Sequence, residues 1–388
     1  MIDAVLVLNA GSSSVKYAVY PVAHAAGAIL RGKIAGIGTA AVFSARDGQG
    51  QPLPTGDLMA VAGQADHATL IPALLTWLQG HAQGVNITAA GHRVVHGGRN
   101  HAGPARITPG LMAGLQALAP LAPLHQPHNL AAIRLVAATM PDLPQIGCFD
   151  SIFHRSQRPL AQMFALPQAL TRAGIIRYGF HGLSYDYIAS TLPDHLGGLA
   201  QGRVIVAHLG SGASLCAIKQ GQSVATSMGF TALDGLVMGR RCGALDPGVV
   251  LYLMQQMGMD AAQVSNLLYT QSGLFGVSGI SSDMAVLQAS NHPDARQAID
   301  LFCHRAAAEL ASLVTALGGL DALVFTAGIG ENSPAVRAGI CDRLAWMGVR
   351  LDAGANDRNA TRIGAGNVQV LVIPTDEEAV IARATRMI

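Results

Sequence analysis

Two segments of the chain, about 200 residues apart, share one pattern: a strand, a turn of small residues and a second strand. Residues 5–8 lead through Asn-Ala-Gly-Ser-Ser-Ser into the alternating apolar residues 15–20. Residues 204–207 lead in the same way through His-Leu-Gly-Ser-Gly-Ala-Ser into residues 215–219. This repeat predicts two domains of similar fold, and 388 residues are enough for two separate cores.

A third strand, residues 322–327, is expected to end in a glycine-rich turn at residues 328–332. The next two residues suit the start of a helix, because Ser333 can act as its N-cap and Pro334 as its first residue.

Helical patterns also flank this third strand. Residues 295–317 have the apolar spacing of a helix, and the glycines at 318–319 provide its end. Residues 368–373 predict a strand, and residues 375–378, Thr-Asp-Glu-Glu, fit a capping box that opens another helix. Strands that alternate with helices predict the α/β fold class.

The composition excludes several kinds of partner. The net charge of +2 lacks the basic excess of a nucleic-acid binder, and polar residues interrupt every apolar stretch before the roughly 18 residues that a membrane helix needs. Asp3 stands where a signal peptide would be basic, and the cysteines form no Cys-x-x-Cys, so we expect reduced thiols in a cytoplasmic protein without nucleic-acid or membrane partners. The five cysteines are Cys148, Cys216, Cys242, Cys303 and Cys341.

Turns rich in glycine and hydroxyl groups can wrap backbone N–H groups around phosphate oxygens. One such turn is most often a plain hairpin, but a matching pair, together with glycines 328 and 330 at a helix start, favours nucleotide binding. Residues 27–33 fit a Walker A pattern until Ile34, which has no hydroxyl for Mg²⁺, and no strand-linked Gly-x-Gly-x-x-Gly is present.

Four charged or imidazole side chains lie beside glycines or in apolar surroundings: Arg93, Asp150, His181 and Arg241. Taken singly, an arginine is usually a surface ion-pair member and a histidine a satisfied structural residue. In a chain with only 12% charged residues, the set suits a site that gathers anions, although spacing alone leaves their convergence open.

Together these segments closely resemble the acetate kinase family, part of the superfamily of acetate and sugar kinases, heat-shock chaperone ATPases and actin. The resemblance covers nearly the whole chain. Its carriers are residues 8–16, 91–98, 122–125, 149–154, 177–182, 208–210, 226–231, 278–283, 325–332 and 374–378.

The resemblance implies two domains of duplicated ribonuclease H-like (actin-like ATPase) fold with the active-site cleft between them. Residues 1–149 with 379–388 would form the N-terminal domain, and residues 150–378 the nucleotide-binding C-terminal domain. The implied reaction is reversible, ATP and acetate giving ADP and acetyl phosphate by direct in-line phosphoryl transfer, with Mg²⁺ or Mn²⁺, in a homodimer.

The resemblance also implies the roles of the catalytic residues. Arg93 would hold the carboxylate and Arg241 the transferring phosphoryl group, to which His181 would donate a hydrogen bond. Family descriptions give Asp150 an acid/base role, but we prefer an orienting role, because a carboxylate acceptor is already ionised at pH 7.

For the metal, the resemblance implies Asn9 and one glutamate of residues 375–378. Glu378 occupies the capping-box position, so we choose Glu377. Expected phosphate and nucleotide contacts are Ser12, Ser14, Lys16, His208, Leu209, Gly210, Ser211, Gly212, Asp283, Met284, Ala285, Gly328, Ile329, Gly330, Glu331 and Asn332.

The implied acyl pocket is small and apolar, formed by Val95, Leu124, Phe180 and Ala232. The family usually has proline at the last position, and a methyl group in place of the ring leaves room for one more methylene. Since a buried CH₂ is worth about 0.8 kcal/mol, propionate is expected to be used nearly as well as acetate.

Other departures lie closer to the nucleotide. Ser211 replaces the usual asparagine and Ala285 the usual arginine, which predicts weaker ATP binding. Residues 182–185, Gly-Leu-Ser-Tyr, replace Gly-Thr-Ser-His, and residues 242–244, Cys-Gly-Ala, replace Ser-Gly-Asp.

Several alternatives remain at this level. A propionate kinase would differ from an acetate kinase chiefly in pocket volume. A non-catalytic ATP-binding switch of the actin and chaperone type would not require Arg93, His181 and Arg241. A sugar kinase would need a base for a neutral hydroxyl, and a degenerate member would bind nucleotide with little turnover.

Overall fold

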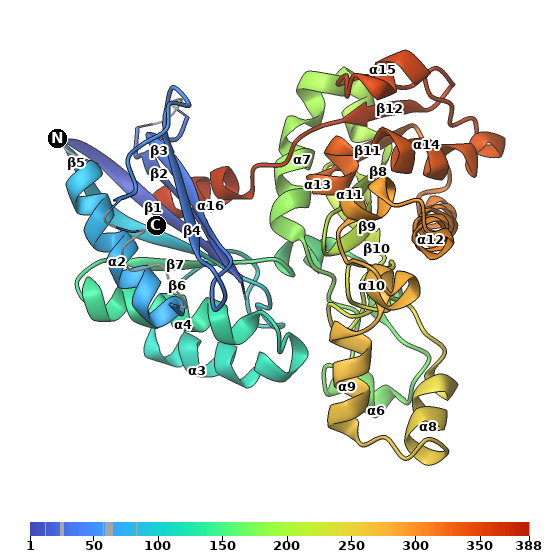
Figure 1. Ribbon diagram of the computed structural model, residues 1–388, viewed down its shortest axis with the longest axis horizontal. Coiled ribbons are helices and arrows are strands. Elements are labelled where there is room, and N and C mark those ends of the chain that lie inside the picture. The colour runs from blue at the N-terminus through green and yellow to red at the C-terminus, as the bar shows by residue number, and fades with distance from the viewer. Residues whose placement is uncertain (12, 24–26, 57, 59–64, 83, 388) are drawn as a thin grey trace. The chain divides into compact units, whose positions relative to one another are not determined.

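The computed structural model describes residues 1–11, 13–23, 27–56, 58, 65–82 and 84–387. It divides into two compact units: the first comprises Met1–Ile152 and Asp376–Ile388, and the second comprises Phe153–Thr375 (Figure 1). The polypeptide therefore leaves the first unit, builds the whole of the second and then returns.

The first unit contains a seven-stranded sheet in the order β4-β3-β2-β1-β5-β7-β6. β1, β5 and β7 run parallel, and the other neighbouring pairs are antiparallel. The strands are β1 (Ile2–Ala10), β2 (Ser14–Pro21), β3 (Leu30–Ala35), β4 (Val42–Asp47), β5 (Val85–Val94), β6 (Ala105–Arg106) and β7 (Gln145–Phe149).

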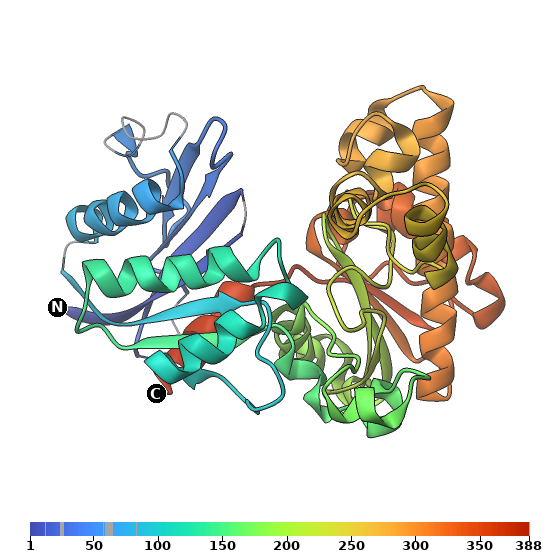
Figure 2. The ribbon, with the colours of Figure 1, turned by 90° about the horizontal axis from the view of Figure 1, so that it is seen from below.

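Helices cover both faces of this sheet (Figure 2). α2 (His67–His81) and α4 (Gln126–Thr139) pack on one face, where Leu6 and Leu8 of β1 join the apolar core. α16 (Glu377–Arg386) packs on the opposite face against β1 and β5. Gly91 permits this approach, because a Cβ there would lie 2.1 Å from the Thr385 hydroxyl oxygen. The unit also contains α3 (Pro109–Ala117) and the 3₁₀ helix η1 (Ala119–Leu121).

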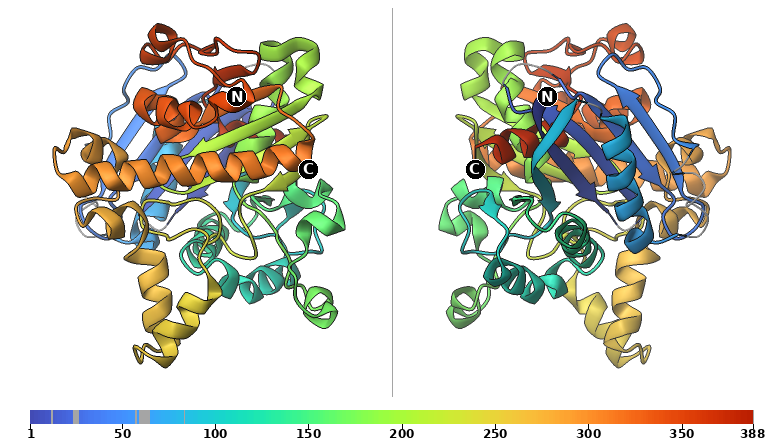
Figure 3. Two further views of the ribbon diagram at one scale, coloured as in Figure 1. Left: turned by 90° about the vertical axis from the view of Figure 1, so that its right-hand side faces the viewer. Right: turned by 90° about the vertical axis from the view of Figure 1, so that its left-hand side faces the viewer.

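The second unit contains a five-stranded sheet in the order β10-β9-β8-β11-β12. Its strands are β8 (Arg203–Leu209), β9 (Ala213–Lys219), β10 (Gln222–Thr226), β11 (Ala322–Thr326) and β12 (Gln369–Val372). α7 (Gly182–Leu196) packs its apolar side on one face through residues such as Ile188 and Leu192. The long α12 (Pro293–Leu317) packs against β8, β9 and β10 (Figure 3).

Shorter helices complete the second unit. They are η2 (Ile152–Ser156), α5 (Pro159–Gln162), α6 (Gln168–Arg172), η3 (Gly197–Gln201), α8 (Pro247–Gln255), α9 (Ala261–Thr270), α10 (Gly273–Ser278), α11 (Met284–Ala289), α13 (Ala327–Asn332), α14 (Pro334–Asp342), η4 (Ala345–Met347) and α15 (Ala353–Asp357). Within the described ranges, no helix combines the length and apolar character required to cross a bilayer.

The two sheets share one topology. In the first, an antiparallel meander β3-β2-β1 continues into the parallel strands β5 and β7, and in the second, β10-β9-β8 continues into β11 and β12. The repeated hairpins of the sequence are thus β1–β2 and β8–β9, and the α/β class with a duplicated fold is confirmed.

Several local predictions can be compared with the structure. Ser333 caps α14 with Pro334 in its first turn, and Gly318 ends α12 in the left-handed conformation at φ 74°, as expected. Residues 328–332 form the short helix α13 instead of a turn. The Walker-like segment runs into β3, so its Lys33 belongs to a strand.

The expected capping box at residues 375–378 is wrong. Asp376 is the N-cap, and its carboxylate accepts a hydrogen bond from the Ala379 backbone N–H. The buried Thr375 hydroxyl has no hydrogen-bond partner within the described residues and so caps nothing, and the Thr375 N–H donates to the Glu331 carboxylate at 3.2 Å.

Candidate active site

Three polar side chains of the first unit stand where parallel strands end. Asn9 lies near the end of β1, Arg93 near the end of β5, and Asp150 directly after β7. Parallel strands bring their carboxyl ends to one edge of the sheet, and alternate residues share a face. Leu8 faces α2 and α4, so its neighbour Asn9 faces the opposite side, toward α16. Arg93 lies beside Asn9 on that same side.

Arg93 and Asp150 form a buried ion pair. Arg93 Nε lies 3.3 and 3.0 Å from the two Asp150 carboxylate oxygens, and Nη2 donates at 2.6 Å. Only 1% of Asp150 is exposed. Burial raises the pKa of Asp150 to about 6, an effect that outweighs the opposing influence of the Arg93 charge.

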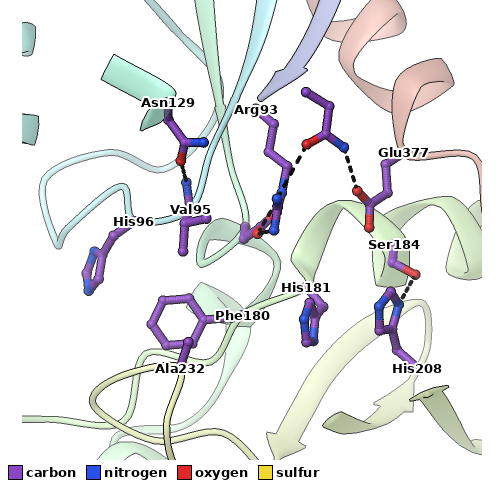
Figure 4. A network of polar contacts seen from close by, with 12 residues as sticks. Arg93, Val95, His96, Asn129, Phe180, His181, Ser184, His208, Ala232 and Glu377 are labelled. Carbon is purple, nitrogen blue, oxygen red and sulfur yellow. Dashed lines mark hydrogen bonds and ion pairs between the residues drawn. The ribbon is translucent and has the colours of Figure 1, made fainter. Parts of the chain in front are cut away.

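The start of α16 brings two carboxylates to the same place. The Asn9 amide nitrogen donates to Glu378 Oε1 at 3.4 Å. It also donates to Glu377 Oε2 at 3.1 Å, and Arg93 Nη1 donates to the Asn9 side-chain Oδ1 at 3.4 Å (Figure 4). Lys16 Nζ lies 3.9 Å from Glu378 Oε1. Burial raises the pKa of Glu378, while Lys16 opposes this shift. Acidic side chains are also favoured here by the positive end of the helix dipole.

The capping-box reason for choosing Glu377 over Glu378 therefore does not hold, and the choice of Glu377 stays a prediction. The Glu378 side chain does not cap the helix; it accepts from the Asn9 amide at 3.4 Å, a longer contact than the one from Asn9 to Glu377. The signal that could have shown this is Asp376 itself, since aspartate is a strong N-cap residue one position later.

Two amide side chains of α4 hold the segment that follows β5. Asn129 accepts from the Val95 N–H at 3.0 Å (Figure 4). It also donates to the Ala10 carbonyl at 2.6 Å. Gln126 bonds both the N–H and the carbonyl of His96. All four of these hydrogen bonds are buried, so Val95 is fixed in place by groups that sequence reasoning did not single out.

The β1–β2 hairpin of the first unit carries the residues expected to contact phosphate. Ser12 lies outside the described residues. The Ser14 carbonyl accepts from the Gly11 N–H at 2.7 Å, which closes the turn, and about half of the Lys16 side chain is exposed beside Glu378. Leu124 lies half-buried between η1 and α4.

In the second unit, a histidine pair lies between α7 and the sheet. His181 precedes α7 with φ 58°, and its Nδ1 lies 2.7 Å from the Ser214 hydroxyl of β9. His208 of β8 is bonded through Nδ1 to Ser184 of α7 at 2.8 Å (Figure 4). The two imidazoles stack with centroids 4.3 Å apart and planes 16° apart, which restricts the rotation of both.

The turn before His181 is held by another buried histidine. His154 Nε2 donates to the Phe180 carbonyl at 2.9 Å, and its Nδ1 lies 2.9 Å from the Ser223 hydroxyl. Burial lowers the pKa of His154 to about 4, so the ring is neutral at pH 7 and can keep this pair of contacts. Gly179, at φ 74°, is needed here, because a Cβ would collide with the His154 ring.

Arg241 approaches His181 over a glycine. Arg241 Nη1 donates to the Ala232 carbonyl at 2.5 Å. A Cβ built on Gly212 would lie 2.7 Å from Arg241 Nη2 and 3.1 Å from His181 Nε2. The absent side chain therefore leaves a space that these two nitrogen atoms border.

A cavity of about 370 Å³ lies next to this space. Gly210 and Ser211, in the same turn as Gly212, line it together with the starts of α11 and α13. Among the residues expected to contact nucleotide, it gathers Gly210, Ser211, Asp283, Met284, Ala285, Gly328, Ile329 and Asn332. His208, Leu209, Gly212, Gly330 and Glu331 do not line it.

Glu331 instead supports the backbone of this region. Its carboxylate accepts from the N–H of Ala327 at 2.8 Å and of Thr375 at 3.2 Å. Arg337, which is wholly buried, donates to the carbonyls of Gly330 and Glu331 at 2.9 and 3.0 Å. Both residues thus fix α13, whose first turn borders the cavity.

Comparisons with known proteins show that the chain is similar to acetate and propionate kinases. Residues 4–383 match the model of the acetokinase family. Acetate kinase of Rhodopseudomonas palustris is 50% identical over 99% of this chain and 98% of its own, and that of Nitrobacter hamburgensis is 48% identical over 99% and 95%. A solved propionate kinase from Francisella tularensis has a TM-score of 0.91 at 35% identity and full coverage of both chains. Porphyromonas gingivalis acetate kinase has 0.85 at 34%, covering 99% of each.

Proposed function

The chain belongs to the acetokinase family, and on that premise we propose that it transfers the γ-phosphoryl group of ATP to acetate, reversibly, giving ADP and acetyl phosphate. One observation carries the proposal. The turn at Gly210 and Gly212 borders both the cavity suited to a nucleotide and the space between Arg241 and His181. Arg241 and His181 thus lie beside the turn that borders this cavity, where they would meet a transferring phosphoryl group.

The proposed chemistry needs little proton transfer. An acetate oxygen attacks the γ-phosphorus, the new oxygen–phosphorus bond forms, and the bond to the β-phosphate oxygen breaks, leaving ADP. Charge on the equatorial oxygens requires donors in place, which Arg241 and His181 would supply. In the first unit, Arg93 would hold the carboxylate, and Asp150 would orient the Arg93 guanidinium through the ion pair.

We also propose a magnesium site at Asn9 and Glu377. Within the described ranges, no three His, Cys, Asp or Glu side chains are arranged to hold a metal ion. A site with one amide and one carboxylate fits Mg²⁺, because Mg²⁺ usually takes one or two carboxylates and completes its shell with water and substrate phosphates. Bound there, Mg²⁺ or Mn²⁺ would neutralise phosphate charge, and the Asn9 amide would keep the carboxylates of α16 in position.

A nucleotide would occupy the second unit's cavity, with Asp283 and the α13 backbone as its neighbours. Ser12, Ser14 and Lys16 would contact phosphates, and His208 would contact the nucleotide. The domain assignment that accompanies these roles is residues 1–149 with 379–388, and residues 150–378.

Propionate kinase is the second candidate, and two observations favour it. The similar structure from Francisella tularensis is a propionate kinase. Ala232 carries only a methyl group, at a position where the family resemblance implies a proline ring. The proposed acyl pocket would take its apolar surface from Val95, Leu124, Phe180 and Ala232.

We further propose a cytoplasmic homodimer that uses the outer face of α8. None of the residues of this helix is buried, and Leu251 and Tyr252 are more than half exposed. An apolar helix of this kind is costly to leave in water, and a second copy would cover it. Light scattering should give a dimer, and Leu251→Glu should give a monomer.

The primary test is a hydroxamate assay of acyl phosphate formed from ATP, Mg²⁺ and acetate, propionate or butyrate. Arg241→Ala should lower kcat at least a thousandfold, in line with other arginines that stabilise phosphoryl transfer. Arg240→Ala is the matched control, because Arg240 is exposed and contacts Phe275 instead, so its activity should stay within about threefold of the wild type.

Other outcomes separate the remaining candidates. ADP release that depends on glucose and not on a carboxylate would favour a sugar kinase. ATP binding without any acyl phosphate from the three acids would favour a nucleotide-binding switch or a degenerate member of the family.

A further inference from the structure

Tyr185 is linked to His181 through one serine hydroxyl. Tyr185 lies one turn into α7 and is wholly buried, and its hydroxyl lies 2.5 Å from Ser214 Oγ. The same Oγ lies 2.7 Å from His181 Nδ1. We call Tyr185, Ser214 and His181 the relay.

The protons of the relay can be assigned from its chemistry. Burial raises the pKa of Tyr185 well above its usual value, so the phenol keeps its proton. Within the described part of the chain, Ser214 is the one hydrogen-bond acceptor within reach of that proton. A serine hydroxyl has a single hydrogen, so an oxygen that accepts from Tyr185 directs its own hydrogen toward His181 Nδ1.

A neutral imidazole that accepts at Nδ1 carries its proton on Nε2. His181 Nε2 borders the space above Gly212, where Arg241 Nη2 also points. The stack on His208 keeps the ring in this orientation. With the opposite tautomer, the Nε2 lone pair would face the oxygens of a phosphoryl group and repel them.

We propose that Tyr185 is a positioning residue that acts through Ser214 to hold His181 in the tautomer with its proton on Nε2. This inference rests on the proposed function for its consequence in catalysis, because only a phosphoryl group in that space makes the Nε2 proton useful. The tautomer itself is a property of the folded protein and can be measured without turnover.

The first test is nitrogen NMR of the full-length protein with ¹⁵N-labelled histidine. The His181 signals are identified by their loss in His181→Asn. We expect a wild-type His181 with a protonated Nε2 and an unprotonated Nδ1, and Tyr185→Phe and Ser214→Ala should each shift the signals toward a mixture of tautomers. A wild-type ring protonated on Nδ1 would overturn the proposal.

The second test divides kcat from KM. Tyr185→Phe should lower kcat for acyl phosphate formation about tenfold, the effect of losing one hydrogen bond in the transition state, with KM for ATP and acetate within twofold. Tyr17→Phe is the matched control: Tyr17 is equally buried, donates to the Ser44 carbonyl in the first unit and should leave kcat unchanged.

The two tests also separate this inference from the proposed function. If wild type forms no acyl phosphate but shows the expected tautomer, which both variants disturb, the proposed function fails and the relay stands. If Tyr185→Phe matches Tyr17→Phe in both the NMR signals and kcat, Tyr185 only fills the core and the relay is overturned.

Discussion

Arg93 donates three hydrogen bonds to the carboxylate of Asp150, and this pair is buried at the edge where β5 and β7 end. Asp150 N–H also bonds the Val94 carbonyl, so the carboxylate is fixed by the backbone before it meets the guanidinium. This geometry suits an Asp150 that orients the Arg93 guanidinium, because Arg93 already occupies both carboxylate oxygens.

The pH dependence of turnover should report this pair. Burial raises the pKa of Asp150 to about 6, so acid below that value should protonate the carboxylate, release Arg93 and lower kcat/KM for acetate about tenfold per pH unit. Asp150→Asn cannot ionise, and its pH–rate profile should lose this limb. A limb near pH 6 that persists in the variant would contradict the orienting role.

The same titration affects stability with the opposite sign. The folded protein binds the Asp150 proton more tightly than the unfolded chain, whose aspartates titrate near 3.8. Its contribution to the free energy of unfolding is therefore complete below about pH 4 and is lost as the pH rises through 6. Urea unfolding of wild type and Asp150→Asn across this range should show the difference.

The two carboxylates at the start of α16 should differ in their contribution to metal binding. Glu377→Gln is expected to raise the Mg²⁺ concentration for half-maximal activity about tenfold or more. Glu378→Gln should have a smaller effect, because Lys16 already offsets the charge of Glu378. Titration of Mg²⁺ at saturating ATP measures both, and a larger effect for Glu378→Gln would transfer the proposed ligand role to that residue.

Gly212→Ala should damage catalysis and spare stability. The new methyl group would meet Arg241 Nη2 at 2.7 Å, which is the flexible end of a side chain that can move away at little cost to folding. We expect kcat to fall about a hundredfold, because donors misplaced by an ångström lose much of their effect, with an unchanged urea midpoint. Gly198→Ala, with open space around its Cβ, is the control.

The size of the residue at position 232 should set the acyl preference. In the wild type, kcat/KM for propionate should lie within about fourfold of that for acetate, the equivalent of one methylene. Ala232→Val keeps the carbonyl that accepts from Arg241 but narrows the pocket, so the propionate-to-acetate ratio should fall about tenfold. An unchanged ratio would place the acyl group elsewhere.

Arg337→Met should destabilise the second unit. The buried guanidinium donates to the carbonyls of Gly330, Glu331 and Asn356 and to the side chains of Asn356 and Asn359, and all would lose a partner. We expect the free energy of unfolding to fall by about 3 kcal/mol and KM for ATP to rise, because α13 borders the cavity. Arg343→Met, at an exposed position, should change stability by less than about 0.5 kcal/mol.

The sequence predicted best what depends on neighbouring residues. The two hairpins, α12 with its Gly318 end and the Ser333 cap follow from local patterns, and the structure contains each of them. The predicted start of α16 is wrong because Thr375 and Asp376 are both good N-cap residues. In the structure Asp376 is the cap, while the Thr375 N–H donates to Glu331, 44 residues away, a contact that no local pattern indicates.

The candidate site divides in the same way. Arg93 and Asp150 could be proposed from the low share of charged residues in the chain and from the family resemblance. Nothing local indicates that the two side chains pair across 57 residues. Tyr185 stood out only as a departure from the family pattern. Its relation to His181 depends on Ser214 from a strand that folds back beneath α7, which no periodicity records.

The return of the chain to the first unit also orders events on the ribosome. Asn9, Arg93 and Asp150 are synthesised before any of the second unit, whereas α16 emerges only after all of it, a delay of roughly tens of seconds at 5–20 residues per second. We expect the face of β1 and β5 that α16 covers in the finished protein to lack this cover throughout that interval. A nascent chain would therefore hold the Arg93–Asp150 ion pair without the carboxylates that Asn9 binds. On this account, translation delays activity until α16 has docked.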